Sequence, residues 1–260
     1  MTEKDRNQVK ILGIGISSTS LKQVLNFVES RLGKDKFYIT TPNPEILVQA
    51  QKDHELAQAL NHADLSLPDG IGIILAASFL DDVRLNRLRG REVMLKLIEY
   101  SNKHCLKVFL LGATDNVIKR TLRTIRKRYK KLQVEGASGP RLNASALPIS
   151  DRDRLIQIDI IDRINKFKPD LLFVAFGAPK QEKWINSHLK ELDIGGAMGV
   201  GGSFDYISGE VALPPIWMGD IGLEWLWRLI IQPSRILRIA RAVVIFPILV
   251  ILSRIGLKRD

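Results

Sequence analysis

Short apolar runs alternate with amphipathic segments along most of this 260-residue chain. Runs that are apolar on both faces are typical of buried parallel strands, and segments with a helical period of apolar positions are typical of the helices that cover such a sheet. The runs expected to form strands are residues 9–16, 37–40, 65–67, 106–111, 132–137, 171–176 and 195–200. The pattern therefore predicts an α/β fold, in which a mostly parallel sheet has helices on both faces.

The clearest transition follows the run 171–176, which breaks at Gly177 and Pro179 and restarts as a charged segment with helical period. This order predicts a strand, a tight loop and a helix with proline in its first turn. Lys180 and Gln181 would lie at the carboxyl end of a strand, where ligands bind in open α/β sheets because helix N-termini point their free N–H groups there. Any βα loop resembles this stretch in part, so an ordinary loop is the alternative.

The loop after the predicted strand 37–40 is stiffened by two prolines, Pro42 and Pro44, on either side of Asn43. Such a loop would present the hydroxyl of Thr41 and the amide of Asn43 to a polar ligand, for example a sugar. The alternative is that Asn43 caps the next helix, with Pro44 at the first helical position. The two roles are compatible.

Asp69 lies in the turn 68–72, between a predicted strand and an apolar helix, and is the only carboxylate between Asp64 and Asp81. An aspartate at such a turn is most often a helix cap. If Asp69 instead faces the ligand cleft, it is the best candidate for a general base in the chain.

Two glycine-containing stretches bear on nucleotide binding. Gly201 and Gly202 follow the predicted strand 195–200, and backbone N–H groups of such a loop can approach a phosphate closely. The loop lacks the Lys-Ser/Thr ending of a P-loop, so an NTPase is not expected. Gly13 and Gly15 begin a dinucleotide fingerprint whose third glycine is missing, because residue 18 is serine.

The charge balance narrows the choice of partners. Lys and Arg number 39 against 28 Asp and Glu, which gives a formal net charge of +11 and a pI near 9.8. Partners that carry phosphate are therefore favoured, whether nucleotides, nucleic acid or an anionic membrane surface. A basic loop at residues 84–91 contains four arginines; such runs are usually solvated faces, but this one precedes an amphipathic helix near the proposed anion site.

Neither a metal nor a cofactor is expected. Cys105 is the single cysteine, which excludes an internal disulfide and a cysteine-cluster metal site and fits a reducing, cytosolic setting. The one Asp-x-Asp string, at 151–153, stands where acidic residues commonly begin a helix, so we interpret it as capping. Residues 1–6 are charged and no apolar segment follows them, so no secretory signal is expected.

The composition changes after Leu213-Pro214-Pro215, which predicts a catalytic core of residues 1–215 and a helical appendage of residues 216–260. A spanning helix needs about 20 apolar residues. Here eleven apolar residues, 242–252, are interrupted by Pro247, so we expect an interfacial helix that does not cross a bilayer. A helix docked on the core or on another subunit is the alternative.

Several motifs occur in a characteristic order: Thr-x-Asn-Pro-Glu (41–45), Asp-Gly-x-Gly (69–72), Arg-x-x-Gly (87–90), Gly-x-Pro-Lys-Gln-Glu-x-Trp (177–184), Gly-Val-Gly-Gly-x-Phe-Asp (199–205), and Glu-Trp-Leu-x-Arg-Leu with Pro-x-Arg-x-x-Arg (224–238). This order resembles the WecG/TagA/CpsF family of bacterial glycosyltransferases. The resemblance implies a Rossmann-like core with an appendage that touches the membrane and helps to close the active site.

The resemblance also implies the reaction and the partners. The family transfers a sugar, often N-acetylmannosamine or its uronate, from a UDP donor to a polyprenyl-diphosphate-linked N-acetylglucosamine. The protein would be peripheral at the cytoplasmic face of the cell membrane, on an anionic surface; nucleic acid is not expected, and a homo-oligomer is left open.

By motif, the resemblance assigns roles to eight residues. Asp69 would be the base that deprotonates the acceptor hydroxyl. The residues expected in the catalytic cleft are Asp69, Thr41, Arg87 and Gln181. The residues expected to bind substrate are Asn43, Arg228, Arg235 and Arg238, to which the glycine-rich loop described above adds Gly201 and Gly202.

The chemistry agrees with an inverting, metal-independent transferase, because arginines can stabilise the charge of departing UDP without a metal. The chain has Ala-Leu-Pro at 212–214 where the family often has Arg-Ala-Pro, and Gly-Arg-Glu at 90–92 where the family often has Gly-Ser/Thr-Asp. A UDP-glucose or uronate donor is therefore an alternative. The other classes are an NAD(P)-dependent oxidoreductase, despite the broken fingerprint, and a non-catalytic membrane adaptor, which leaves the loops of Thr41, Asp69 and Gln181 unexplained.

Overall fold

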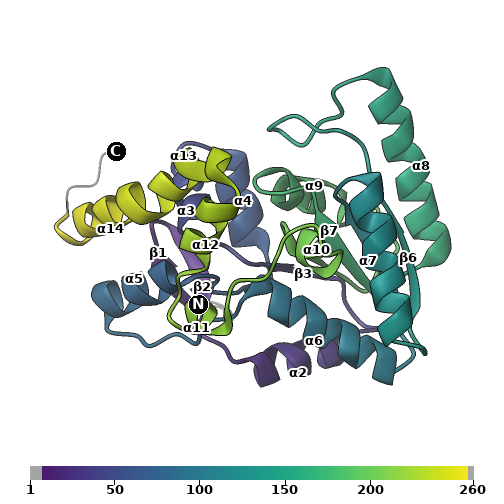
Figure 1. The fold of residues 1–260 in the computed structure, drawn as a ribbon, viewed down its shortest axis with the longest axis horizontal. Helices are drawn as coiled ribbons and strands as arrows, with labels where there is room; N and C mark the ends of the chain where they lie inside the picture. Colours follow the sequence, from purple (N-terminus) through teal and green to yellow (C-terminus); the bar gives the residue numbers. More distant parts are fainter. Residues whose placement is uncertain (1–7, 257–260) are drawn as a thin grey trace.

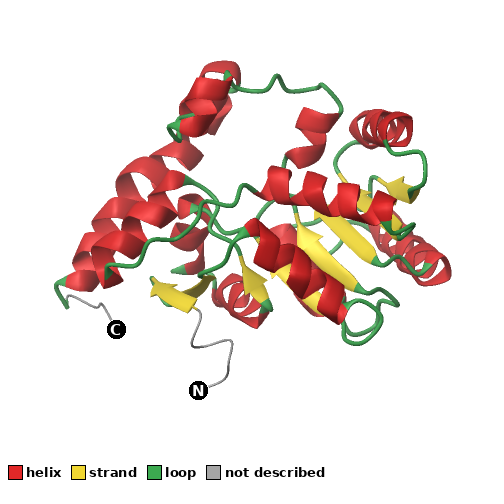
Figure 2. Ribbon diagram, turned by 90° about the horizontal axis from the view of Figure 1, so that it is seen from below, coloured by secondary structure: helices red, strands yellow, loops and turns green. Residues whose placement is uncertain are grey.

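A six-stranded parallel sheet forms the centre of the part of the chain that the computed structural model describes, residues 8–256 (Figures 1 and 2). The strands lie in the order β4-β3-β8-β7-β5-β6. Their bounds are β3 (Phe37–Thr40), β4 (Leu65–Ser66), β5 (Lys107–Gly112), β6 (Gln133–Ala137), β7 (Leu171–Ala175) and β8 (Gly196–Gly199). The predicted α/β fold, Rossmann-like with a parallel sheet, is confirmed.

Helices cover both faces of the sheet, as Figure 2 shows. Those of the core are α2 (Leu21–Arg31), α3 (Pro44–Ala50), α4 (His54–His62), α5 (Ile71–Asp81), α6 (Gly90–Lys103), α7 (Asp115–Arg128), α8 (Asp151–Phe167), α9 (Lys180–His188) and α10 (Ser203–Ile207). The C-terminal part adds α11 (Ile216–Asp220), α12 (Glu224–Ile231), η1 (Pro233–Arg235), α13 (Ile236–Ala240), η2 (Arg241–Ile245) and α14 (Phe246–Arg254). Residues of α2, α6 and α7 pack on one face of the sheet, and residues of α8 and α9 pack on the other.

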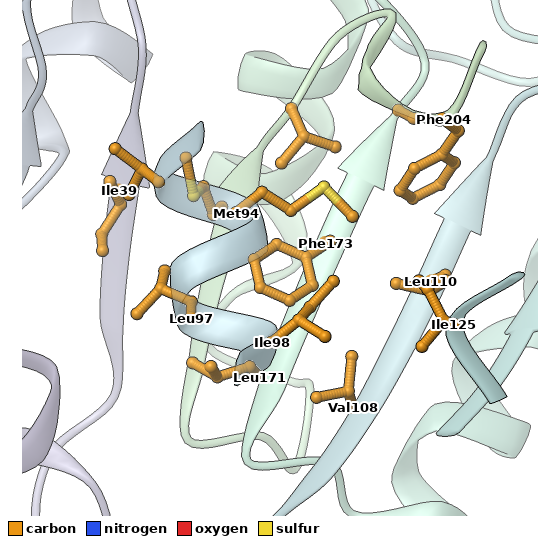
Figure 3. Packing of buried hydrophobic residues seen from close by; sticks show 14 of the residues in the cluster. Ile39, Met94, Leu97, Ile98, Val108, Leu110, Ile125, Leu171, Phe173 and Phe204 are labelled. Carbon is orange, nitrogen blue, oxygen red and sulfur yellow. The ribbon is translucent and has the colours of Figure 1, made fainter. Parts of the chain in front are cut away.

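The core between α6 and the sheet explains why these segments fold as they do. Met94, Leu97 and Ile98 recur at helical spacing on one side of α6, and they contact Leu171 and Phe173 of β7 (Figure 3). Every residue of β7 is buried, because helices cover both sides of it. An uninterrupted apolar strand is therefore stable only at the middle of such a sheet.

The predicted single strand 9–16 is wrong. The segment forms an antiparallel hairpin of β1 (Gln8–Ile11) and β2 (Ile14–Ser17), outside the parallel sheet. Leu12 and Gly13 between the strands have φ of 50° and 79°, the left-handed conformation that tight two-residue hairpin turns require. The turn is difficult to recognise in the sequence because leucine rarely adopts this conformation.

The C-terminal helix is longer than the apolar run 242–252 from which an interfacial helix is expected. The chain is helical from Pro233 to Arg254, a segment of 22 residues that is long and apolar enough to cross a bilayer by length and composition. Pro247 lies in the first turn of α14, directly after the π-helical turn η2. Proline has no N–H to donate to the preceding turn of the helix. The wider π-helical turn before Pro247 lets the helix continue without that hydrogen bond.

One face of α14 packs on protein. Phe246 and Val250, four residues apart, are buried in a second core formed with α3, α4, α5 and the β1-β2 hairpin. Ile248 and Ile251 on the rest of the helix are exposed. The alternative of a C-terminal helix docked on the core therefore holds for one face of α14 only.

Two further expectations are not tested by the fold. The division into a core and an appendage at residue 215 stays a prediction. The expectation for residues 1–6 falls outside the described part of the chain.

Gly112 is a position where the sheet leaves no room for a side chain. Its φ is +112°, and an added Cβ would lie 2.7 Å from the backbone of Ala175 in β7. Gly112→Ala should lower the free energy of unfolding in urea by about 3 kcal/mol or more, because backbone strain and overpacking add. Gly33→Ala is the matched control, with φ of +74° and nothing within 4 Å of the new Cβ. It should cost about 1 kcal/mol, and equal losses for the two variants would contradict the packing argument.

Candidate active site

One cavity of 790 Å³ lies at the carboxyl ends of the strands, beneath the C-terminal helices. Its walls come from the loops after β3, β4, β5, β7 and β8, and from α12, α13 and η2. All ten residues predicted for the site line it: Thr41, Asn43, Asp69, Arg87, Gln181, Gly201, Gly202, Arg228, Arg235 and Arg238. The parallel sheet therefore gathers residues that are far apart in the sequence.

Asp69 follows β4 and faces this cavity. Gly70, without a side-chain bond, occupies the cap position of α5, so Asp69 is not the cap of the helix that follows it. Its Oδ2 instead accepts a hydrogen bond of 3.3 Å from the backbone N–H of Gly90, at the start of α6. The pKa of Asp69 is raised to about 6, chiefly by burial; Glu224 also acts to raise this pKa, while the Gly90 bond, Arg228 and Arg87 act to lower it. Asp69 is therefore a carboxyl group poised to exchange a proton near neutral pH.

Thr41 and Asn43 have structural bonds as well as positions in the cavity wall. The Thr41 hydroxyl donates to the carbonyl of Gly199 in β8 at 3.3 Å. Asn43 Oδ1 accepts from the N–H of Ile46 at 3.0 Å and caps α3, with Pro44 at the first position. The capping alternative for Asn43 is confirmed, and it places the side chain at the cavity.

Gln181 joins two loops of the cavity wall. Its Oε1 accepts from the N–H of Gly177 at 3.2 Å and from the N–H of Gly201 at 2.9 Å. Its Nε2 donates to Oε1 of Glu182 at 2.8 Å, and the residue is 2% exposed. The side chain thus holds the β7-α9 and β8-α10 loops in register, a role that the sequence did not indicate.

Glu182 accepts the hydrogen bond from the Gln181 amide, and the sequence analysis did not identify this residue as part of the site. Glu182 is buried, and its Oε2 has no hydrogen-bond partner among the described residues. Burial raises the pKa of this carboxyl to about 7, against the lowering effect of the Gln181 bond. A proton on Oε2 removes the buried charge and leaves Oε1 free to accept from Gln181.

Arginines of the C-terminal helices form the roof of the cavity. Arg228 Nε donates to the hydroxyl of Tyr206 at 2.7 Å, and its guanidinium lies 4.8 Å from the centre of that ring. Arg238 pairs with Glu45 at 2.7 Å. Arg235 is half-buried, and its pKa is lowered first by burial and then by Arg228 and Arg238. Three neighbouring cations that disfavour one another favour binding of an anion at this roof.

Residues of the basic loop 84–91 tie the roof to the core. Arg87 Nη2 donates to the carbonyl of Gly219 at 2.5 Å, and Arg89 Nη2 donates to the same carbonyl. Arg89 Nε also pairs with Glu224 of α12 at 3.1 Å. The loop is therefore not simply a solvated face, because it anchors α11 and α12 over the cavity.

The glycines after β8 have close contacts within the protein. The N–H of Gly201 donates to Gln181, and the approach of this loop to a phosphate stays a prediction. At Gly202 an added Cβ would lie 3.0 Å from Nη2 of Arg228. Glycine at 202 thus lets the arginine approach the loop closely.

Several other cavity residues were not assigned from the sequence: Glu45, Asp205, Tyr206 and Glu224. Glu45, Asp205 and Glu224 lie within the motifs quoted above, and this position is the signal by which the sequence could have identified them.

The Asp-x-Asp string at 151–153 begins α8 and does not line the cavity described above. Asp153 accepts hydrogen bonds from Ser150 and Arg141, and its pKa is lowered to about 2, first by the Ser150 bond. Within residues 8–256, no group of three His, Cys, Asp or Glu side chains is arranged to hold a metal ion.

The Gln181 bonds can be tested directly. Gln181→Leu removes the acceptor for Gly177 and Gly201, so amide hydrogen exchange at both glycines should accelerate. Loss of three bonds should also lower the free energy of unfolding by about 3 kcal/mol. Gln51→Leu, at an exposed position whose amide bonds lie elsewhere, is the control and should leave both glycines unchanged. Slow exchange at Gly177 and Gly201 in Gln181→Leu would remove this role.

Comparison with known proteins agrees with this arrangement. The family model described as glycosyl transferase WecG/TagA/CpsF matches residues 9–260. An N-acetylglucosaminyldiphosphoundecaprenol N-acetyl-beta-D-mannosaminyltransferase of Bacillus subtilis (strain 168) is 33% identical over 210 residues, 81% of this chain and 76% of the relative. A protein of the same name from Staphylococcus aureus (strain NCTC 8325 / PS 47) is 29% identical over 245 residues, 92% of each chain. The chain thus belongs to the WecG/TagA/CpsF family and is a glycosyltransferase.

Proposed function

We propose that this chain transfers an N-acetylmannosamine-like sugar from a UDP donor to a polyprenyl-diphosphate-linked N-acetylglucosamine, in the synthesis of a cell-surface polysaccharide or a teichoic-acid-type polymer. One observation carries the proposal: the carboxyl of Asp69, which is partly buried and has a raised pKa, shares a cavity with the arginine cluster of Arg228, Arg235 and Arg238. The names of the two relatives support the sugar and the lipid-linked acceptor.

The proposed reaction is a single displacement. The acceptor hydroxyl attacks the anomeric carbon of the donor, and Asp69 takes the proton from that hydroxyl. The bond between the anomeric carbon and the phosphate oxygen breaks, and its electron pair leaves with UDP. Because one nucleophile enters opposite the leaving group, an α-linked donor gives a β-linked product.

The arginine cluster stabilises the UDP leaving group in the proposed reaction. Positive charge fixed at the roof stabilises the negative charge that develops on the diphosphate in the transition state. Arg235 is half-buried between Arg228 and Arg238, where water screens its charge less than at an open surface. We therefore propose that transfer is independent of a divalent metal.

We further propose a peripheral position at the cytoplasmic face of the membrane. One face of α14 is docked through Phe246 and Val250, which favours a helix lying along the protein over an isolated span. Exposed apolar side chains, among them Trp217 and Ile248, are available to lipid. Each arginine near an anionic leaflet contributes about 1 kcal/mol to attachment.

The alternatives make different use of the same chain. In an NAD(P)-dependent oxidoreductase, Gly13 and Gly15 would form a turn between a parallel strand and a helix, but they lie in and beside the antiparallel hairpin. A non-catalytic adaptor would not need Asp69 in a cavity with arginines. UDP-glucose and a UDP-uronate remain alternative donors of the same reaction.

The decisive experiment offers a panel of UDP-sugars with a synthetic lipid-diphosphate N-acetylglucosamine and measures UDP release. We expect the N-acetylmannosamine donor to be used best, with turnover unchanged in EDTA and a β linkage in the product by NMR. Release that stops in chelator and returns with Mg²⁺ would contradict metal independence, and an α product would contradict the single displacement. NAD(P) binding without UDP release would favour the oxidoreductase.

Asp69 offers the sharpest test of the mechanism. Asp69→Asn keeps an oxygen to accept from Gly90 but removes the base, so kcat should fall by about 10²-fold or more. In the wild type, kcat/KM should decline as pH falls below about 6, where the carboxylate becomes protonated. Asp151→Asn, at a fully solvated position, is the control. Normal turnover by Asp69→Asn, or the same acid limb in that variant, would rule out this base.

A further inference from the structure

The cavity has two chemically different parts. Asp69 and the roof arginines form a charged part, whereas α5 and the last helices contribute apolar side chains: Leu75, Ile239, Ala242, Val243 and Pro247. Because Leu75 and Val243 are exposed, we place the mouth of the cavity at this apolar part. Leu75 is 62% exposed although it lines the cavity. A ligand that fills the whole space would therefore meet charge first and hydrocarbon farther out.

The apolar lining continues beyond the cavity, because α5 and α14 run side by side away from it (Figure 1). Near the cavity, a Cβ at Gly72 would lie 3.7 Å from the ring of Phe246. At the far end, the guanidinium of Arg254 lies 4.4 Å from the ring centre of Phe79, and Nη1 donates to the carbonyl of that residue. The two helices are thus joined at both ends.

Each helix carries a row of exposed apolar residues along this course. Leu75 and Phe79 are four residues apart on α5, and Val243, Pro247 and Ile251 are four and eight residues apart on η2 and α14. Residues at this spacing share one face of a helix. We call these five residues the apolar track; its first members lie at the cavity mouth and its last near Arg254.

We propose that the isoprenoid chain of the lipid-diphosphate acceptor lies along the apolar track, which makes the track the hydrocarbon subsite of the enzyme. This inference rests on the function proposed above. Charge complementarity selects the occupant: the cationic part of the cavity, where Arg228, Arg235 and Arg238 are proposed above to stabilise the donor diphosphate, adjoins Ile239 and Ala242. An acceptor whose own diphosphate shares this cationic part can therefore extend its hydrocarbon onto the track. The sugar on the other side of the diphosphate then points toward Asp69.

The hydrocarbon of a bilayer lipid has the same chemistry, but it would not enter the cavity. Leu75, Val243 and Pro247 are cavity residues as well as track residues, which favours a chain covalently attached to the ligand inside. The nine residues of α14 span about 14 Å. In detergent solution, kcat/KM should rise with the length of the acceptor chain and level off when the hydrocarbon covers about that distance.

The test compares two acceptors in detergent, where no bilayer is present: one with a full isoprenoid chain and one with a short alkyl group in its place. Leu75→Glu puts a carboxylate on the track, so KM for the isoprenoid acceptor should rise by about 10-fold or more. KM for the short acceptor should change far less. Ile251→Glu, at the outer end of the track, should act in the same direction and provides a second variant should Leu75→Glu fold poorly.

Leu147→Glu is the control, because Leu147 is similarly exposed and lines no part of the cavity. Equal changes for both acceptors, or no change in either variant, would overturn the proposal. The proposal would also be overturned if the variants no longer sediment with anionic vesicles but keep the wild-type ratio of KM values for the two acceptors in detergent. The substituted residues would then contact only the bilayer. If the wild type uses neither acceptor, the proposed function fails first and the subsite falls with it.

Discussion

Parallel pairing of the six strands is the constraint on which the site depends. When all strands point the same way, every loop that leaves a strand toward its helix starts at one edge, and polar groups from distant segments meet there. Gln181 makes this edge rigid, because one amide oxygen accepts N–H groups from two neighbouring loops. The amide nitrogen is satisfied by Glu182, so the bond network reaches from the cavity wall into the core.

The charges of the cavity are arranged around this rigid edge. Asp69 is held by the first N–H of α6 and feels the charges of Arg228 and Arg87, whose own partners are the Tyr206 hydroxyl and the Gly219 carbonyl. Burial raises the pKa of Asp69 more than its neighbours lower it. The result is a group able to accept a proton close to a cluster of cations, which is the pairing on which the proposed sugar transfer depends.

The last helices combine charged and apolar surface on one segment of the chain. Arginines at the start of the segment 233–254 face the cavity, the middle docks through Phe246 and Val250, and the remaining surface is exposed and apolar. The same segment thus forms both the roof of the cavity and an exposed apolar surface. Arginines of the loop 84–91 hold α11 and α12 over the same cavity.

The sequence by itself determined the fold class, the apolar runs that form the six parallel strands and, through the order of its motifs, ten of the residues that line the cavity, because apolar runs and motif order survive in the linear pattern. Only the tertiary structure decided that Gly201 binds Gln181, that Asn43 caps a helix while lining the cavity, and that Glu182 carries a buried, unpaired oxygen. It also turned residues 8–17 into a hairpin and carried a helix through Pro247. Hydrogen-bond partners and local backbone angles depend on neighbours that are remote in the sequence, so periodicity and composition cannot specify them.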